Sequence, residues 1–69
     1  MPKSLLSDGR EVLIEIVTLG AYAKVSAIDP LTGTEVSVVG PGNATRASLE
    51  AAALNKLNYV LKKKADEQG

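Results

Sequence analysis

The stretch from Ala44 to Lys64 most constrains how this chain can fold, because it is the only segment long and periodic enough to cover a core. At about 100° per residue, one arc of about 140° collects its main apolar side chains: Leu49, Ala53, Leu54, Leu57, Val60 and Leu61. The opposite side carries Ser48, Asn55, Lys56, Tyr59, Lys62 and Lys63. This pattern predicts an amphipathic helix with a broad buried stripe.

Signals at both ends agree with this helix. Gly40-Pro41-Gly42 interrupts the preceding segment, and either Asn43 or Thr45 is suited to cap the first turn. Lys62–Lys64 lie in the last turn, where cations interact favourably with the helix dipole.

Glu50 falls inside the apolar arc near the helix start. Arg46, four residues earlier, is placed to pair with it, so the two predict a polar rim beside the helix.

Upstream of the helix, three segments have strand character. Glu11–Leu19 is rich in β-branched residues and predicts a strand, followed by a two-residue turn at Gly20-Ala21. Tyr22–Ile28 predicts the second strand. Residues 29–34 have the Pro and Gly placement of a four-residue hairpin loop, and Glu35–Val39 predicts the third strand. Residues 1–9, with Pro2 and Gly9, predict an irregular, flexible arm.

The two hairpins define a register if Leu19 faces Tyr22 and Asp29 faces Thr34. Alternation then gives an almost wholly apolar face made of Val12, Ile14, Ile16, Thr18, Ala23, Val25, Ala27, Val36 and Val38. Because both hairpins agree on this face, the helix is expected to cover it. The sequence predicts an α+β fold over residues 10–64: a three-stranded antiparallel meander (β-β-β-α) with one helix on one face, followed by a frayed tail at residues 65–69.

Composition excludes several classes of function. The chain contains neither Cys nor His, so the usual zinc ligands are missing and a nucleophile would have to be activated by a lysine or a carboxylate. We therefore expect no enzyme, no catalytic or metal-binding residues and no cofactor. Eight basic and eight acidic residues give no net charge, which argues against a chain built mainly to hold nucleic acid or anionic membrane. The N-terminal residues lack a signal-peptide pattern and no segment has membrane-span length, so the cytoplasm is expected.

The second sheet face is mixed rather than polar. Its apolar members predict a partner interface: Leu13, Val17, Leu19, Tyr22, Ile28 and Val39. The alternative is an ordinary solvated face. Since the first strand also forms an unprotected edge, self-association as a homodimer or docking of another protein is the favoured function.

The span Gly9–Leu61 resembles a family of short bacterial proteins, found chiefly in alphaproteobacteria, that carry a domain of unknown function. The segments that carry the resemblance are Gly9–Val12, Lys24–Pro30, Thr32–Val36, Val39–Pro41 and, in the helix, Ala52-Ala53-Leu54, Lys56-Leu57 and Tyr59-Val60-Leu61. The resemblance implies a stand-alone small domain and brings no activity with it.

The order β-β-β-α, with Gly40-Pro41-Gly42 before Ala51–Leu54, is similar to the C-terminal two-thirds of double-stranded-RNA-binding domains. That resemblance implies RNA binding as the alternative function, through Arg46 and Lys62–Lys64. The first helix of that domain is missing here, and a single basic residue stands within Asn43–Ser48 where the family has a lysine cluster.

Overall fold

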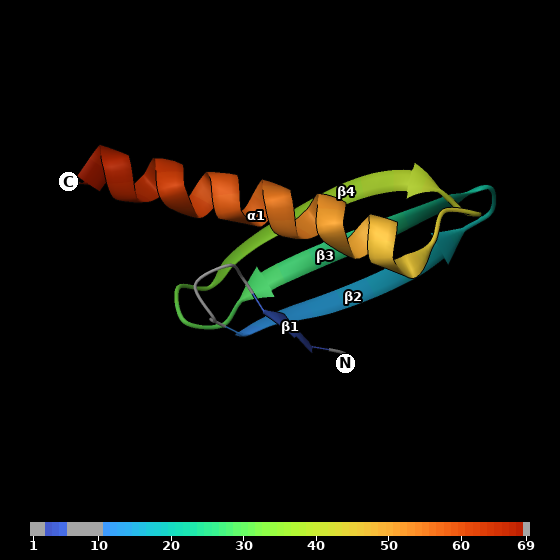
Figure 1. Ribbon diagram of the computed structural model, residues 1–69, viewed down its shortest axis with the longest axis horizontal. Coiled ribbons are helices and arrows are strands. Elements are labelled where there is room, and N and C mark those ends of the chain that lie inside the picture. The colour runs from blue at the N-terminus through green and yellow to red at the C-terminus, as the bar shows by residue number, and fades with distance from the viewer. Residues whose placement is uncertain (1–2, 6–10, 69) are drawn as a thin grey trace.

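Three strands follow one another as an antiparallel meander: β2 (Glu11–Leu19), β3 (Tyr22–Asp29) and β4 (Thr34–Pro41). The helix α1 (Arg46–Gln68) follows β4 and crosses one face of the sheet (Figure 1). The computed structural model describes residues 3–5 and 11–68. The predicted β-β-β-α meander, an α+β fold, is confirmed.

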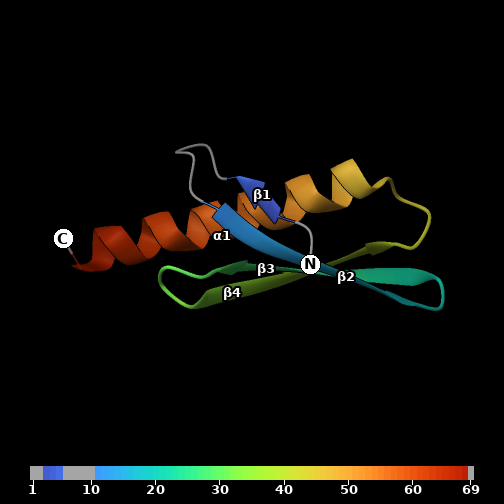
Figure 2. The same cartoon turned by 90° about the horizontal axis from the view of Figure 1, so that it is seen from below.

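A short strand, β1 (Lys3–Leu5), is added at the edge of the sheet beside the start of β2 (Figure 2). It runs antiparallel to β2, with Lys3 opposite Leu13 and Leu5 opposite Glu11. The prediction of an irregular arm over residues 1–9 is therefore wrong at Lys3–Leu5, where the unpaired edge of β2 offers backbone partners to a segment with little strand pattern of its own. The remainder of that predicted arm lies outside the described residues.

The pairing register matches the predicted one. Leu19 lies opposite Tyr22 and Asp29 lies opposite Thr34. Gly20 and Gly33 take φ values of 61° and 76° in the two turns, a backbone region that favours glycine. β4 continues two residues beyond its predicted end, because Gly40 and Pro41 remain paired with β3. The turns therefore decide which side chains lie on each face.

The core lies between the sheet and α1, which packs mainly on β3 and β4. Its buried apolar side chains are Val12, Ile14, Ala23, Val25, Ala27, Val36, Leu49, Ala53 and Leu57. Leu54, Val60 and Leu61 pack against this core and are half-buried, so the apolar arc predicted for the helix is the buried one. Thr18, predicted to be covered, is exposed because α1 lies away from the end of β2.

The start of α1 agrees with one of the two predicted caps, and its end lies beyond the predicted one. Thr45 is the cap, with its Oγ1 accepting a hydrogen bond from the Ser48 N–H at 3.1 Å. The helix also continues through the predicted frayed tail to Gln68. Figure 1 shows this last part of α1 projecting past the β3–β4 loop, where Lys62 to Glu67 are exposed.

Gly42 is in close contact with the β2–β3 turn. Its N–H donates to the Ala21 carbonyl at 2.7 Å, and a Cβ at this position would lie 3.0 Å from the same oxygen. The loop before α1 therefore holds the helix start against the sheet, and this backbone donor is already occupied within the protein.

Gly42→Ala is expected to lower the free energy of unfolding by about 1–2 kcal/mol, because the added methyl group pushes the loop away from Ala21. Urea denaturation followed by circular dichroism measures this change. Asn43→Ala, an exposed neighbour, is the control and is expected to change stability by less than about 0.5 kcal/mol. Equal stability of the two variants would contradict a packing role for Gly42.

Candidate functional site

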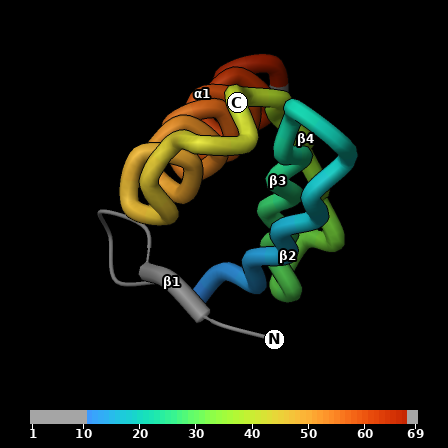
Figure 3. Tube along the Cα trace, turned by 90° about the vertical axis from the view of Figure 1, so that its right-hand side faces the viewer, coloured from blue at the N-terminus to red at the C-terminus, as the bar shows by residue number. Residues whose placement is uncertain are grey.

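The helix leaves the opposite face of the sheet uncovered, and this face is called the open face below. Figure 3 looks along the molecule and shows α1 on one side of the sheet only. Because side chains alternate between the faces, β2, β3 and β4 contribute every second residue to the open face: Leu13, Glu15, Val17, Leu19, Tyr22, Lys24, Ser26, Ile28, Glu35, Ser37 and Val39.

Four large apolar side chains gather at the end of the open face nearest the β2–β3 turn. Val17, Leu19, Tyr22 and Val39 are 42%, 57%, 62% and 68% exposed. Leu19 lies opposite Tyr22, and Lys24 lies between Val17 and Val39 in the register. We call these four residues the apolar cluster. They form one contiguous apolar surface of three strands with a single cation in it, as expected for a contact surface.

The middle of the open face is polar. Glu15, Ser26 and Ser37 lie side by side across the three strands. The Ser26 and Ser37 hydroxyl oxygens are 3.1 Å apart and hydrogen-bonded, and Ser26 is buried. This polar row separates the apolar cluster from the opposite end of the face.

The six residues predicted as an interface therefore do not form one surface. Leu13 and Ile28 face each other on the far side of the polar row and are half-buried. The structure brings together only the four members of the apolar cluster. Alternation along the strands predicted the face correctly, but the serine pair in its centre determines where the apolar surface ends.

Arg46 and Glu50, predicted to form a polar rim beside the helix, lie away from the open face. Arg46 Nε is 3.2 Å from Glu50 Oε2, within the first turns of α1 and therefore on the other side of the sheet. The side chains are 55% and 21% exposed, so this i,i+4 pair is worth only a few tenths of a kcal/mol, about 0.3–0.5. It does not border the open face.

The cations proposed for RNA do not gather either. Arg46 and Lys62 are sixteen positions apart in the helix, which corresponds to about 24 Å along α1. Lys64 Nζ donates to Thr34 Oγ1 at 3.2 Å. Lys62 and Lys63, with Tyr59 and Asp66, line an open hollow of about 330 Å³ on the projecting part of α1.

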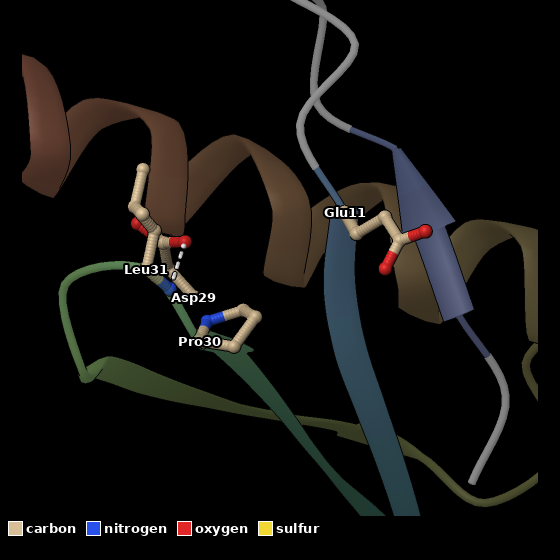
Figure 4. Close-up of a pocket in the computed structure, with 4 residues that line it drawn as sticks. All are labelled: Glu11, Asp29, Pro30 and Leu31. Atoms are coloured by element: carbon tan, nitrogen blue, oxygen red, sulfur yellow. Dashed lines mark hydrogen bonds between the residues drawn. The ribbon is translucent and has the colours of Figure 1, made fainter.

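A buried carboxylate was not anticipated from the sequence. Asp29 is 1% exposed at the end of β3, where Oδ1 accepts from the Leu31 N–H at 3.1 Å and Oδ2 accepts from the Thr32 hydroxyl at 2.9 Å. With Glu11, Pro30 and Leu31 it lines an open hollow of about 360 Å³ (Figure 4). These hydrogen bonds hold the β3–β4 loop, so the carboxylate has a structural role.

The parity of the register could have revealed this burial, because Asp29 and Thr34 both fall on the face beneath α1.

Among the described residues, no group of three His, Cys, Asp or Glu side chains is placed to hold a metal ion. Nor does any described helix combine the length and hydropathy that are needed to cross a bilayer.

Comparison with known proteins places the chain in a family without assigning it an activity. Residues 9–64 match the family model described as a domain of unknown function (DUF6898), and the chain belongs to this family. No curated protein matches the sequence. No solved structure matches it either.

Proposed function

We propose that this DUF6898 protein is a non-enzymatic protein-binding module that assembles with a second copy of itself through the apolar cluster. The observation that carries the proposal is the exposure of Val17, Leu19, Tyr22 and Val39 on one contiguous surface of the sheet. Packing of two such faces would remove these side chains from water, at roughly 25 cal/mol for each Å² of apolar surface buried.

The arrangement of the face favours a second copy as the partner. With a two-fold axis along β3, Val17 of one copy lies over Val39 of the other, and the two Tyr22 rings approach each other. The same axis places Lys24 opposite the partner's Lys24, so the two ammonium groups must turn away from each other, each toward the diagonal Glu15 of its own copy. Glu15 lies one row away from Lys24, so each copy brings both charges to the contact and the paired faces carry no excess of either sign there.

The absence of His and Cys from the sequence supports a non-enzymatic role. The buried carboxylate of Asp29 is already used as a hydrogen-bond acceptor by its own loop. The serine hydroxyls on the open face are hydrogen-bonded to each other. These groups serve the structure, which leaves the apolar cluster as the surface best suited to a binding function.

Val39→Asp is expected to weaken self-association at least tenfold, because it replaces an apolar side chain of the contact by a carboxylate that loses water on association, and pairing with the neighbouring Lys24 repays only part of that cost. Sedimentation equilibrium over a concentration series measures the dissociation constant. Leu31→Asp is the matched control: Leu31 is 78% exposed, lies in the β3–β4 loop and is outside the apolar cluster. Circular dichroism should show both variants folded. A monomeric wild-type protein at millimolar concentration, or equal dissociation constants for the two variants, would refute the proposal.

Nucleic-acid binding receives less support, because Arg46 and Lys62 are far apart on α1 and Lys64 contacts Thr34. Phosphate contacts are strongest at low salt. We therefore expect no mobility shift of a double-stranded RNA at low ionic strength. A shift that is abolished by Lys62→Glu together with Lys63→Glu would instead establish the alternative.

A further inference from the structure

The C-terminal half of β2 is the least protected edge among the described strands. β1 pairs with β2 only from Glu11 to Leu13, and no other described strand lies on that side of Glu15–Leu19. α1 packs on β3 and β4, so the helix does not shield this segment from above. Val17, Thr18 and Leu19 are accordingly exposed.

The backbone groups on this edge follow from the hairpin geometry. A two-residue turn makes Leu19 and Tyr22 a hydrogen-bonded pair, so alternate residues Ile16 and Thr18 direct their N–H and C=O groups away from β3. The same alternation of N–H and C=O directions continues through β3 to β4. It points the Ser37 carbonyl away from β3. Lys56 Nζ donates to that carbonyl at 2.9 Å, which confirms the parity independently.

The β4 edge is thus protected against strand pairing, whereas the C-terminal half of the β2 edge is not. On β4, the Lys56 ammonium occupies an outward carbonyl in the middle of the strand, and Pro41 ends the strand without a donor. Lysine and proline are devices by which proteins block strand addition. Glu15–Leu19 carries neither of these residues and is rich in β-branched residues. An edge of this composition is suited to pairing with another strand.

We propose that this edge pairs with the same edge of a second copy, antiparallel, with Val17 on the two-fold axis. In this register Ile16 faces the partner's Thr18, and their outward N–H and C=O groups complete four backbone hydrogen bonds. Glu15 faces the partner's Leu19, so no like charges lie directly opposite each other. Shifting the register by two residues either brings the partner's Leu19 to Leu13, where β1 already pairs, or shortens the overlap.

This contact differs from the one proposed above, since it joins strand edges rather than faces and does not depend on the apolar cluster being buried. It would extend the four-stranded sheet across the axis into one continuous sheet. The apolar clusters of the two copies would then lie on the same face. Two edge-paired dimers could also pack their open faces against each other. The resulting assembly would combine the two kinds of two-fold axis.

Cysteine cross-linking tests the register, because the chain has no cysteine of its own. Opposite residues of a non-hydrogen-bonded antiparallel pair have Cα atoms about 4.5 Å apart, within the range for a disulfide, whereas facing sheets about 10 Å apart exceed it. Val17→Cys is expected to form a covalent dimer at least tenfold faster than Val39→Cys in a glutathione redox buffer. Val39 is the more exposed of the two and lies two strands from the axis, so exposure alone predicts the opposite order.

Thr18→Pro provides the second test, because it removes an outward N–H without touching the β2–β3 ladder. It is expected to raise the dissociation constant at least tenfold, whereas Thr18→Ala, which keeps the N–H, should leave it nearly unchanged.

If the proline variant unfolds, the cross-linking rates decide. Equal rates for Val17→Cys and Val39→Cys, or equal dissociation constants for folded Thr18→Pro and Thr18→Ala, would overturn edge pairing. Loss of association in Val39→Asp but not in Thr18→Pro would retain the face contact alone, and the reverse would retain edge pairing alone.

Discussion

Leu57→Ala is expected to lower the free energy of unfolding by about 3 kcal/mol. Leu57 is fully buried in the middle of α1 and belongs to the same cluster as Val25 and Ala27 of the central strand. Ala23 and Ala27, which belong to the same buried cluster, are small side chains. Removal of the leucine side chain leaves a cavity that these short neighbours cannot close, and the lost contacts add to the lost transfer free energy.

The size of this effect matters because a small domain has little stability to lose. A chain of 69 residues is expected to have an unfolding free energy near the lower end of about 5–15 kcal/mol. Leu57→Ala should therefore populate the unfolded state measurably at 37 °C. Urea denaturation at 25 °C gives the change directly, and thermal unfolding should show a large fall in midpoint.

Two controls separate burial from a general effect of shortening leucine. Leu54 is half-buried on the same helix, and Leu54→Ala is expected to cost about 1 kcal/mol. Leu31 is 78% exposed, and Leu31→Ala should be close to neutral. If all three variants lost similar stability, the buried stripe of α1 would not be the main support of the core.

Most of this fold could be predicted from the sequence, because independent local signals agree. Gly20 and Gly33 each mark a turn at which a positive φ is required, and the two turns separately place Ile14, Val25 and Val36 on one face. The helix then needs an apolar stripe of matching size, which Leu49, Ala53 and Leu57 provide. Agreement between turn chemistry, alternation and helical period leaves few other arrangements.

The structure departs from the predicted elements at the two ends of the chain, for different reasons. Lys3–Leu5 is too short to show alternation, and it becomes a strand because β2 offers an unpaired edge. Beyond Lys64 the apolar period ends, which predicted fraying. However, Ala65, Glu67 and Gln68 have good intrinsic helix propensity, and α1 continues to Gln68 although Ala65 to Glu67 are exposed.

The candidate site was only partly predictable. Alternation assigns Leu13 and Val17 to the same face, but it does not report how much of each side chain is covered. The Ser26–Ser37 hydrogen bond in the middle of the face divides its two apolar ends, and only the end near the β2–β3 turn is exposed. The pairing of polar residues on neighbouring strands, rather than the period of one strand, determines this division.

Asp29→Ala is expected to be the second most damaging change, with a loss of about 2–3 kcal/mol. The carboxylate is 1% exposed and accepts hydrogen bonds from the Leu31 N–H and the Thr32 hydroxyl, which would both lose their acceptor. Thr32 Oγ1 also lies 2.8 Å from Thr34 Oγ1, so the loss would spread along the loop to the first residue of β4. The turn would then hold the β3–β4 register less firmly.

Asp29→Asn is the matched variant, because its carbonyl oxygen can still accept from the Leu31 N–H while its amide can donate to the Thr32 hydroxyl. It should retain about 1 kcal/mol or more of the stability that the alanine variant loses. Hydrogen exchange of the Leu31 amide should quicken in Asp29→Ala and change much less in Asp29→Asn.

Equal stability of the two variants would show that occupancy by a polar side chain is unimportant here. Unchanged exchange at Leu31 in Asp29→Ala would contradict the hydrogen bond as the cause. Since Asp29 lies far from the apolar cluster in the register, neither variant should alter self-association while the protein remains folded.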